Sequence, residues 1–94
     1  MAGERILIVD DSKYMVSFLA ETALPALGYV PLVASTGNDG LELVASADPD
    51  LILLDFNLPD MNGMEVVRQL AAAGSQTPVI FMTAHGSEKV AVEA

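Results

Sequence analysis

Acidic residues follow two of the aliphatic runs in this sequence, and a threonine follows a third. Asp10 and Asp11 come after RILIV, Asp55 ends LILLD, and Thr83 comes after VIFM. Carboxylates about 4 Å apart repel by roughly 4 kcal/mol at an effective dielectric constant near 20. A cluster of three would therefore have raised pKa values or would bind a cation. Oxygen ligands without a nearby His or Cys favour Mg²⁺, which often bridges carboxylates to a phosphoryl group.

These residues can act together only if the fold brings the ends of the three runs to one place. Runs such as LILL, with no alternating polar residues, are typical of strands buried on both faces of a parallel sheet. The predicted strands cover residues 5–9, 29–34, 51–55 and 77–84, and the predicted helices run from Ser12 to Gly28, over residues 40–47, from Met64 to Gly74 and from Gly86 onward. This alternation predicts an α/β fold of parallel strands joined by right-handed crossovers.

The carboxyl ends of such strands are where functional groups collect in an open, doubly wound sheet. Asp10, Asp11, Asp55 and Thr83 all stand at strand ends in this assignment. We therefore expect the three carboxylates and the hydroxyl to lie at one edge of the sheet.

Proline and glycine set local boundaries in the first third of the chain. Pro31 cannot donate to a sheet ladder, so the strand over residues 29–34 is predicted at an edge. Ser12 should cap the first helix, Pro25 should kink or end it, and Gly28 should be its C-cap. The apolar face of this helix is predicted to hold Met15, Phe18, Leu19, Thr22 and Ala23.

Composition limits the classes of protein that this chain can represent. Its 94 residues make one domain, and 52% hydrophobic with 18% charged residues is typical of a globular chain with a large core. A net charge of -9 disfavours direct binding to nucleic acid. There is no cysteine for a disulfide or thiolate site. The N-terminal apolar run of four residues is too short for a signal peptide or a membrane span, so we expect a cytoplasmic protein.

Three motifs resemble one known family, the receiver domains of bacterial two-component response regulators. They are the pair Asp10-Asp11 after the first strand, LLDFNLPDMNGMEV around Asp55, and PVIFMTAH with Thr83. The resemblance covers essentially the whole chain, with the motifs in the family's order and spacing. It implies a flavodoxin-like, doubly wound parallel sheet with strand order 2-1-3-4, incomplete because the family's fifth strand and last helix are missing.

The same resemblance implies a role for each residue of the motifs. Asp55 would accept a phosphoryl group from a histidine kinase or phosphotransfer protein in a phosphorelay. Asp10, Asp11, Asp55 and the backbone carbonyl of Asn57 would hold Mg²⁺, and Thr83 would be the switch hydroxyl that bonds the phosphoryl oxygen. The chain would not be an enzyme beyond catalysing its own phosphorylation and dephosphorylation.

The residue types suit this chemistry independently of the family. A carboxylate oxygen can attack phosphorus to form an acyl phosphate, and Mg²⁺ can neutralise charge on the group being transferred. Pro59 fixes φ and Gly63 permits positive φ, so both are predicted to shape the loop after Asp55.

Simpler interpretations exist for some of these residues. Asp10 or Asp11 alone could be a helix cap. A calcium loop starting at Asp55 fails because Pro59 occupies a ligand position and Asp60 stands where glycine is required. His85 is more typical of an exposed loop residue than of a catalytic one.

The C-terminal part of the sequence is consistent with a second, different kind of function. Residues 1–94 are predicted to be a single receiver domain that stops within its fourth helix, without the strand-end lysine of the family. The chain could then be a receiver-derived dimerisation or interaction module that is not productively phosphorylated. The fourth strand would be an unprotected apolar edge, which is a template for pairing with another chain. We therefore expect a homodimer through this strand and the Ser87–Ala94 segment.

Overall fold

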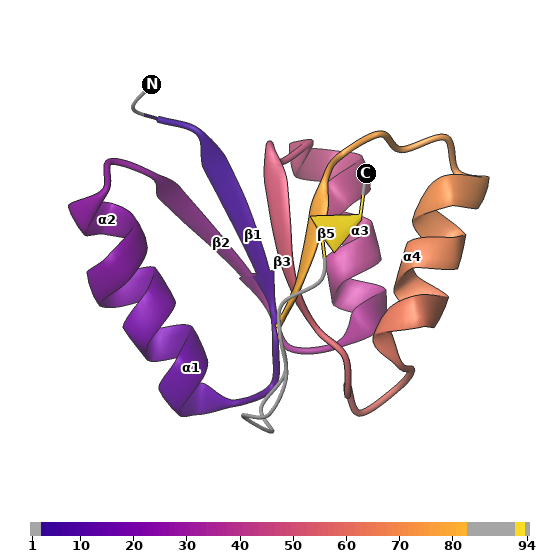
Figure 1. Cartoon of the computed structure of the whole chain (residues 1–94), viewed down its shortest axis with the longest axis horizontal. Coiled ribbons are helices and arrows are strands. Elements are labelled where there is room, and N and C mark those ends of the chain that lie inside the picture. Colours follow the sequence, from indigo (N-terminus) through magenta and orange to yellow (C-terminus); the bar gives the residue numbers. More distant parts are fainter. Residues whose placement is uncertain (1–2, 83–91, 94) are drawn as a thin grey trace.

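A parallel sheet with helices on both faces forms the molecule (Figure 1). The computed structural model describes residues 3–82 and 92–93. Strands β1 (Arg5–Val9), β2 (Val30–Ala34), β3 (Leu51–Asp55) and β4 (Val79–Met82) are all parallel, in the order β2-β1-β3-β4. Figure 1 shows α1 (Lys13–Ser17) and α2 (Leu24–Ala26) on one face, with α3 (Gly37–Ala47) and α4 (Gly63–Ala72) on the other. The predicted α/β class and strand order are therefore confirmed.

The central strands are buried because helices cover both of their faces. Leu7 and Ile8 are adjacent on β1, yet both are fully buried. Successive side chains of a strand point to opposite faces, and the two residues accordingly belong to different core clusters. Leu7 packs in the larger cluster with Leu54 and Leu70, whereas Ile8 packs with Leu24 in the smaller one. This two-sided burial explains the uninterrupted aliphatic runs of the sequence.

Strand β2 lies at the edge of the sheet, as Pro31 predicted. Among the described strands it pairs only with β1, and Pro31 stands opposite Ile6 in that pairing. A proline can occupy this position because the outer side of an edge strand does not require an N–H donor.

The first helical region is less regular than its sequence predicts. A π-helical segment, η1 (Phe18–Ala23), joins α1 to α2, and the Leu24 N–H bonds the Leu19 carbonyl five residues back. This wider turn precedes Pro25, which has no N–H to donate. The region ends as predicted at Gly28, whose φ of 87° permits the closing hydrogen bonds from Gly28 to Pro25 and from Tyr29 to Leu24.

The side chains of the first helical region that face the sheet differ in part from the predicted ones. Val16, Leu19, Ala20 and Leu24 pack in the smaller core cluster. Met15 and Phe18, predicted on the apolar face, are 38% and 57% exposed, and Thr22 is exposed as well. The predicted face was wrong at these positions because apolar residues stand at two adjacent registers of this region, and the buried set, which keeps three- and four-residue spacing, is offset by one residue from the predicted one.

Beyond β4 the structure describes only a short strand, β5 (Val92–Glu93). It pairs antiparallel with β4, placing Glu93 opposite Val79 and Val92 opposite Ile80. The prediction of a helix through this segment was wrong for these two residues, because the β4 edge offers backbone partners for an extended chain. Thr83, His85 and the rest of the Ser87–Ala94 segment lie outside the described residues. Over the described part of the chain, no helix has the length and apolarity needed to cross a membrane.

Candidate functional site

Three carboxylates meet at the carboxyl end of the sheet. Strands β1 and β3 are neighbours, with Val9 opposite Leu54, so Asp10 and Asp55 follow at the same level. One carboxylate oxygen each from Asp10, Asp11 and Asp55 lies within 4.8 Å of the others. Asp10 and Asp55 are buried, with 5% and 9% exposure, and Asp11 is exposed. The expected convergence of these three residues is therefore observed.

Short-range hydrogen bonds orient the two buried carboxylates. Asp10 Oδ1 accepts from the backbone N–H of Ser12 at 2.9 Å, and Asp55 Oδ1 accepts from that of Asn57 at 3.4 Å. The backbone of Asp10 is itself held, because its N–H donates to the Ala34 carbonyl of β2 at 3.0 Å. Each side chain is thus fixed by the turn that follows its own strand.

Burial and like charge both act on Asp55. Desolvation by burial raises the pKa of its carboxyl above the usual 3.8, and the negative charges of Asp10 and Asp11 raise it further, while the Asn57 N–H opposes them. A cation held by the three groups would relieve this repulsion. The set contains only oxygen donors, which fits a hard cation such as Mg²⁺ and does not fit a soft metal.

The loop after Asp55 is closed into a compact hairpin. The Gly63 N–H donates to the Phe56 carbonyl at 2.6 Å, and the Leu58 N–H donates to the Met61 carbonyl at 3.3 Å. Asn57 and Asn62 form an antiparallel bridge across it. These contacts hold the backbone of Asn57, two residues beyond Asp55, in one conformation.

Gly63 is required in this loop for a reason other than the predicted one. Its φ is not positive, whereas among the described glycines Gly3, Gly28 and Gly74 do have a positive φ. Instead, a Cβ at Gly63 would lie 2.7 Å from Phe81 Cε1 and 3.1 Å from Phe56 Cα. The absence of a side chain lets α4 begin directly against β4 and the site loop.

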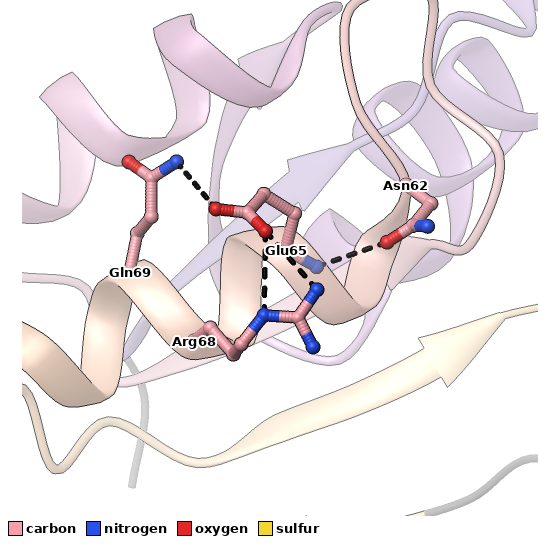
Figure 2. Close-up of polar contacts among 4 residues, drawn as sticks. All are labelled: Asn62, Glu65, Arg68 and Gln69. Atoms are coloured by element: carbon pink, nitrogen blue, oxygen red, sulfur yellow. Dashed lines mark hydrogen bonds and ion pairs between the residues drawn. The ribbon is translucent and has the colours of Figure 1, made fainter.

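Polar contacts at the start of α4 hold the far end of the loop (Figure 2). Asn62 caps the helix, its Oδ1 accepting from the Glu65 N–H at 2.9 Å. The Glu65 carboxylate accepts from Gln69 Nε2 and Arg68 Nη2, both at 3.0 Å. These donors, Gln69 first, lower the pKa of the exposed Glu65 carboxyl.

One residue of the loop makes contacts that sequence reasoning missed. Asp60 accepts from the backbone N–H groups of Gly37 and Asn38, the first two residues of α3. These partners lie 23 and 22 residues earlier in the chain. An aspartate in a Pro-Asp loop looks locally like a turn residue, so no local pattern could have indicated this long-range contact.

The surface beside the carboxylates is hollowed. An open hollow of about 270 Å³ is lined by Asp10, Asp11, Ser12, Lys13, Val16, Ser17, Val33 and Ser35. It lies where β1 ends, next to Asp10 and Asp11. Of the predicted site residues, Thr83 lies outside the described residues, one position after Met82, which pairs with Asp55.

Comparison with known proteins agrees with this arrangement. The model of the response regulator receiver domain family matches residues 6–94. Regulatory protein LuxO of Vibrio vulnificus is 41% identical over 87 residues, which are 93% of this chain and 19% of that protein. Sporulation initiation phosphotransferase F of Bacillus subtilis is 37% identical over 86 residues, covering 92% of this chain and 68% of that protein.

Solved structures give the same result. The signal receiver domain of a putative LuxO repressor from Vibrio parahaemolyticus superposes with a TM-score of 0.80 at 33% identity, covering 89% of this chain and 64% of that one. The chain therefore belongs to the response regulator receiver domain family. It spans about a fifth of the length of its LuxO relative.

The unfavourable environment of the Asp55 carboxylate predicts how the free energy of unfolding depends on pH. Folding raises the pKa of the Asp55 carboxyl above its usual 3.8, so ionisation of this group is less favourable in the folded chain than in the unfolded one. The folded state therefore loses stability as pH rises from 3.8 through the raised pKa. Asp55→Asn removes the charge. We expect it to increase the free energy of unfolding at pH 7 in Mg²⁺-free buffer, with the increase shrinking toward pH 4. Urea denaturation at several pH values measures this.

Asp39→Asn is the matched control, because it makes the same change at an exposed carboxylate in the first turn of α3. It should lack the growing advantage of Asp55→Asn between pH 4 and 7. An Asp55→Asn variant whose stability difference from the native chain is the same at both ends of this range would contradict the electrostatic account of the site.

Proposed function

We propose that this chain is a phospho-accepting receiver domain that takes a phosphoryl group from a histidine kinase or phosphotransfer protein onto Asp55. The observation that carries the proposal is the convergence of Asp10, Asp11 and a buried Asp55 at one end of the sheet. Membership of the receiver family supports it, as does a relative that is itself named a phosphotransferase.

The reaction needs a nucleophile held in one orientation at an accessible position. An oxygen of the Asp55 carboxylate attacks the phosphorus of a phosphohistidine. The new O–P bond gives an acyl phosphate, while the N–P bond breaks and the imidazole keeps its electron pair and takes up a proton. The Asn57 N–H and the β3 backbone orient this carboxylate. We propose that the donor approaches through the hollow lined by Asp10 and Asp11, which belong to the same carboxylate cluster as Asp55.

The neighbouring residues suit a bound Mg²⁺. Asp10, Asp11 and Asp55 would hold it together with the backbone carbonyl of Asn57, whose loop is closed by the hairpin hydrogen bonds. When bound, the cation would neutralise charge on the transferring phosphoryl group. The fold itself positions the Asp55 nucleophile and holds the three mutually repelling carboxylates close together.

Thr83 is proposed to read the phosphorylated state by donating its hydroxyl hydrogen to a phosphoryl oxygen. Such a switch shifts a pre-existing equilibrium, and a shift from 1:99 to 99:1 requires about 5.5 kcal/mol of differential stabilisation. Any catalysis is confined to the chain's own phosphorylation and dephosphorylation. We further propose that the chain acts in a phosphorelay and that it is located in the cytoplasm.

Phosphorylation is tested by intact-mass analysis after incubation with a small acyl phosphate and Mg²⁺. We expect the native chain to gain one phosphoryl group, and Asp55→Asn to gain none because it lacks the nucleophile. Chelating Mg²⁺ should reduce labelling by at least about tenfold, since it removes the charge neutralisation. Asp39→Asn, at an exposed carboxylate away from the cluster, should be labelled like the native chain.

Thr83→Ala separates the acceptor from the switch. It should still be phosphorylated, because the hydroxyl bonds the product and does not attack phosphorus. Equal labelling of Asp55→Asn and the native chain would refute the assignment of the acceptor. Complete failure of Thr83→Ala to be labelled would refute the role given to Thr83.

The interaction-module alternative rests on the edge of β4. β5 pairs there with Val79 and Ile80, whereas Phe81 and Met82 lie beyond the described pairing. We propose that two chains associate around this edge, with β4 and the Ser87–Ala94 segment at the interface, either by edge pairing or by exchange of the segment across a two-fold axis.

Light scattering at micromolar concentration tests the homodimer. We expect about twice the mass of one chain, because pairing completes the ladder beside the apolar β4 strand. A persistent, folded monomer would contradict this and would mean that the pairing of β5 with β4 within one chain is enough to satisfy the edge.

A further inference from the structure

Asp60 binds the start of a helix that is remote from it in the sequence. Its Oδ1 accepts from the Gly37 N–H at 2.7 Å, and its Oδ2 accepts from the Asn38 N–H at 2.9 Å. The first N–H groups of a helix have no partner within the helix, and they favour a negative charge. A carboxylate using both oxygens is therefore a strong anchor at this position.

The same helix carries a second cap that is purely local. Thr36 is the N-cap residue, and its Oγ1 accepts from the Asp39 N–H at 3.0 Å. The two caps thus serve consecutive amides of α3. Only the Asp60 cap connects the helix to another part of the chain, the loop between β3 and α4.

Close packing at two glycines of α3 reinforces this connection. A Cβ at Gly37 would lie 2.6 Å from Met61 Cγ, so the first turn of α3 sits directly against the residue after Asp60. A Cβ at Gly40 would lie 3.0 Å from Cγ2 of Val9, which is the last residue of β1 and precedes Asp10. The start of α3 therefore lies against the loop that carries Asn57 and against Val9 of β1.

Asp60 and Asn57 belong to one short hairpin. The Leu58 to Met61 and Gly63 to Phe56 hydrogen bonds close it, and the Asn57–Asn62 bridge spans it. Because Met61 accepts one of these bonds and follows Asp60 directly, displacement of Asp60 would be transmitted to Leu58 and its neighbour Asn57.

We propose that Asp60 is a positioning residue, whose two hydrogen bonds to the start of α3 hold the loop so that Asn57 presents its backbone carbonyl to a cation bound by the three carboxylates. This inference rests on the proposed function, because it assigns Asp60 a part in forming the Mg²⁺ site. The N–H groups of Asn38 and Gly37 also lower the pKa of the Asp60 carboxyl, which keeps it in the ionised form that can accept both bonds.

The test compares Mg²⁺ affinity among variants by following amide chemical shifts in an NMR titration. Asp60→Ala should weaken binding by about tenfold, the lower end of the range for residues that orient metal ligands. Asp60→Asn should lie between Asp60→Ala and the native chain, because its single amide oxygen can replace one acceptor but not both. Thr36→Ala, which weakens the same helix start without touching the loop, should stay within about twofold of the native chain.

A second measurement follows the loop without any metal. In Mg²⁺-free buffer, hydrogen exchange of the Leu58 and Gly63 amides should be faster in Asp60→Ala than in the native chain, and unchanged in Thr36→Ala. A purely structural cap would instead make the two alanine variants alike in both measurements, which would overturn the proposal.

The outcomes separate this inference from the proposed function. If the native chain binds Mg²⁺ and Asp60→Ala binds it equally well, Asp60 has no positioning role and the proposed function is unaffected. If the native chain does not bind Mg²⁺, the proposed metal site is wrong and the positioning role toward it falls as well. Unchanged exchange of Leu58 and Gly63 in Asp60→Ala would show that Asp60 does not hold the loop.

Discussion

Mutual repulsion among Asp10, Asp11 and Asp55 is the constraint on which the rest of the site depends. The pairing of β1 with β3 forces Asp10 and Asp55 together at the sheet end, and burial keeps water from screening them fully. The backbone N–H groups of Ser12 and Asn57 donate to Asp10 and Asp55, which offsets only part of the repulsion between the carboxylates. A fold that keeps such a cluster gives up stability at a functional site, as is common where charge must be available for chemistry.

The surrounding elements hold this cluster from several directions. The hydrophobic clusters on the two faces fix β1 and β3, and Asn62 and Gly63 let α4 begin directly after the site loop. Asp60 then joins that loop to α3. The carboxylates are thus positioned by packing of the sheet, while the neighbouring backbone is positioned by polar contacts between loop and helix.

Strand positions and the carboxylate cluster could be predicted from the sequence because each follows from a local pattern, whereas the strand order was implied by the resemblance to the receiver family. Aliphatic runs mark buried strands, Pro31 marks an edge, and parallel strands place Asp10 and Asp55 at the same end. The wrong or missing predictions involve packing contacts that a local pattern does not define. Gly63 proved to be needed for close packing, and the partners of Asp60 lie more than twenty residues away. In the first helical region the apolar residues fit two adjacent faces, and local spacing alone did not show which one packs on the sheet.

The central claim is that Asp10, Asp11 and Asp55 form a cation site, and the protonation of the Asp55 carboxyl tests it most directly. A ¹³C NMR titration of its carboxyl signal, assigned by its loss in Asp55→Asn, should be carried out with EDTA and with saturating Mg²⁺. Without Mg²⁺ we expect a midpoint above the usual pKa of 3.8, because burial and Asp10 oppose ionisation, and with Mg²⁺ we expect a clearly lower midpoint. An Asp55 midpoint that is the same in both buffers would contradict the claim that these carboxylates form a cation site.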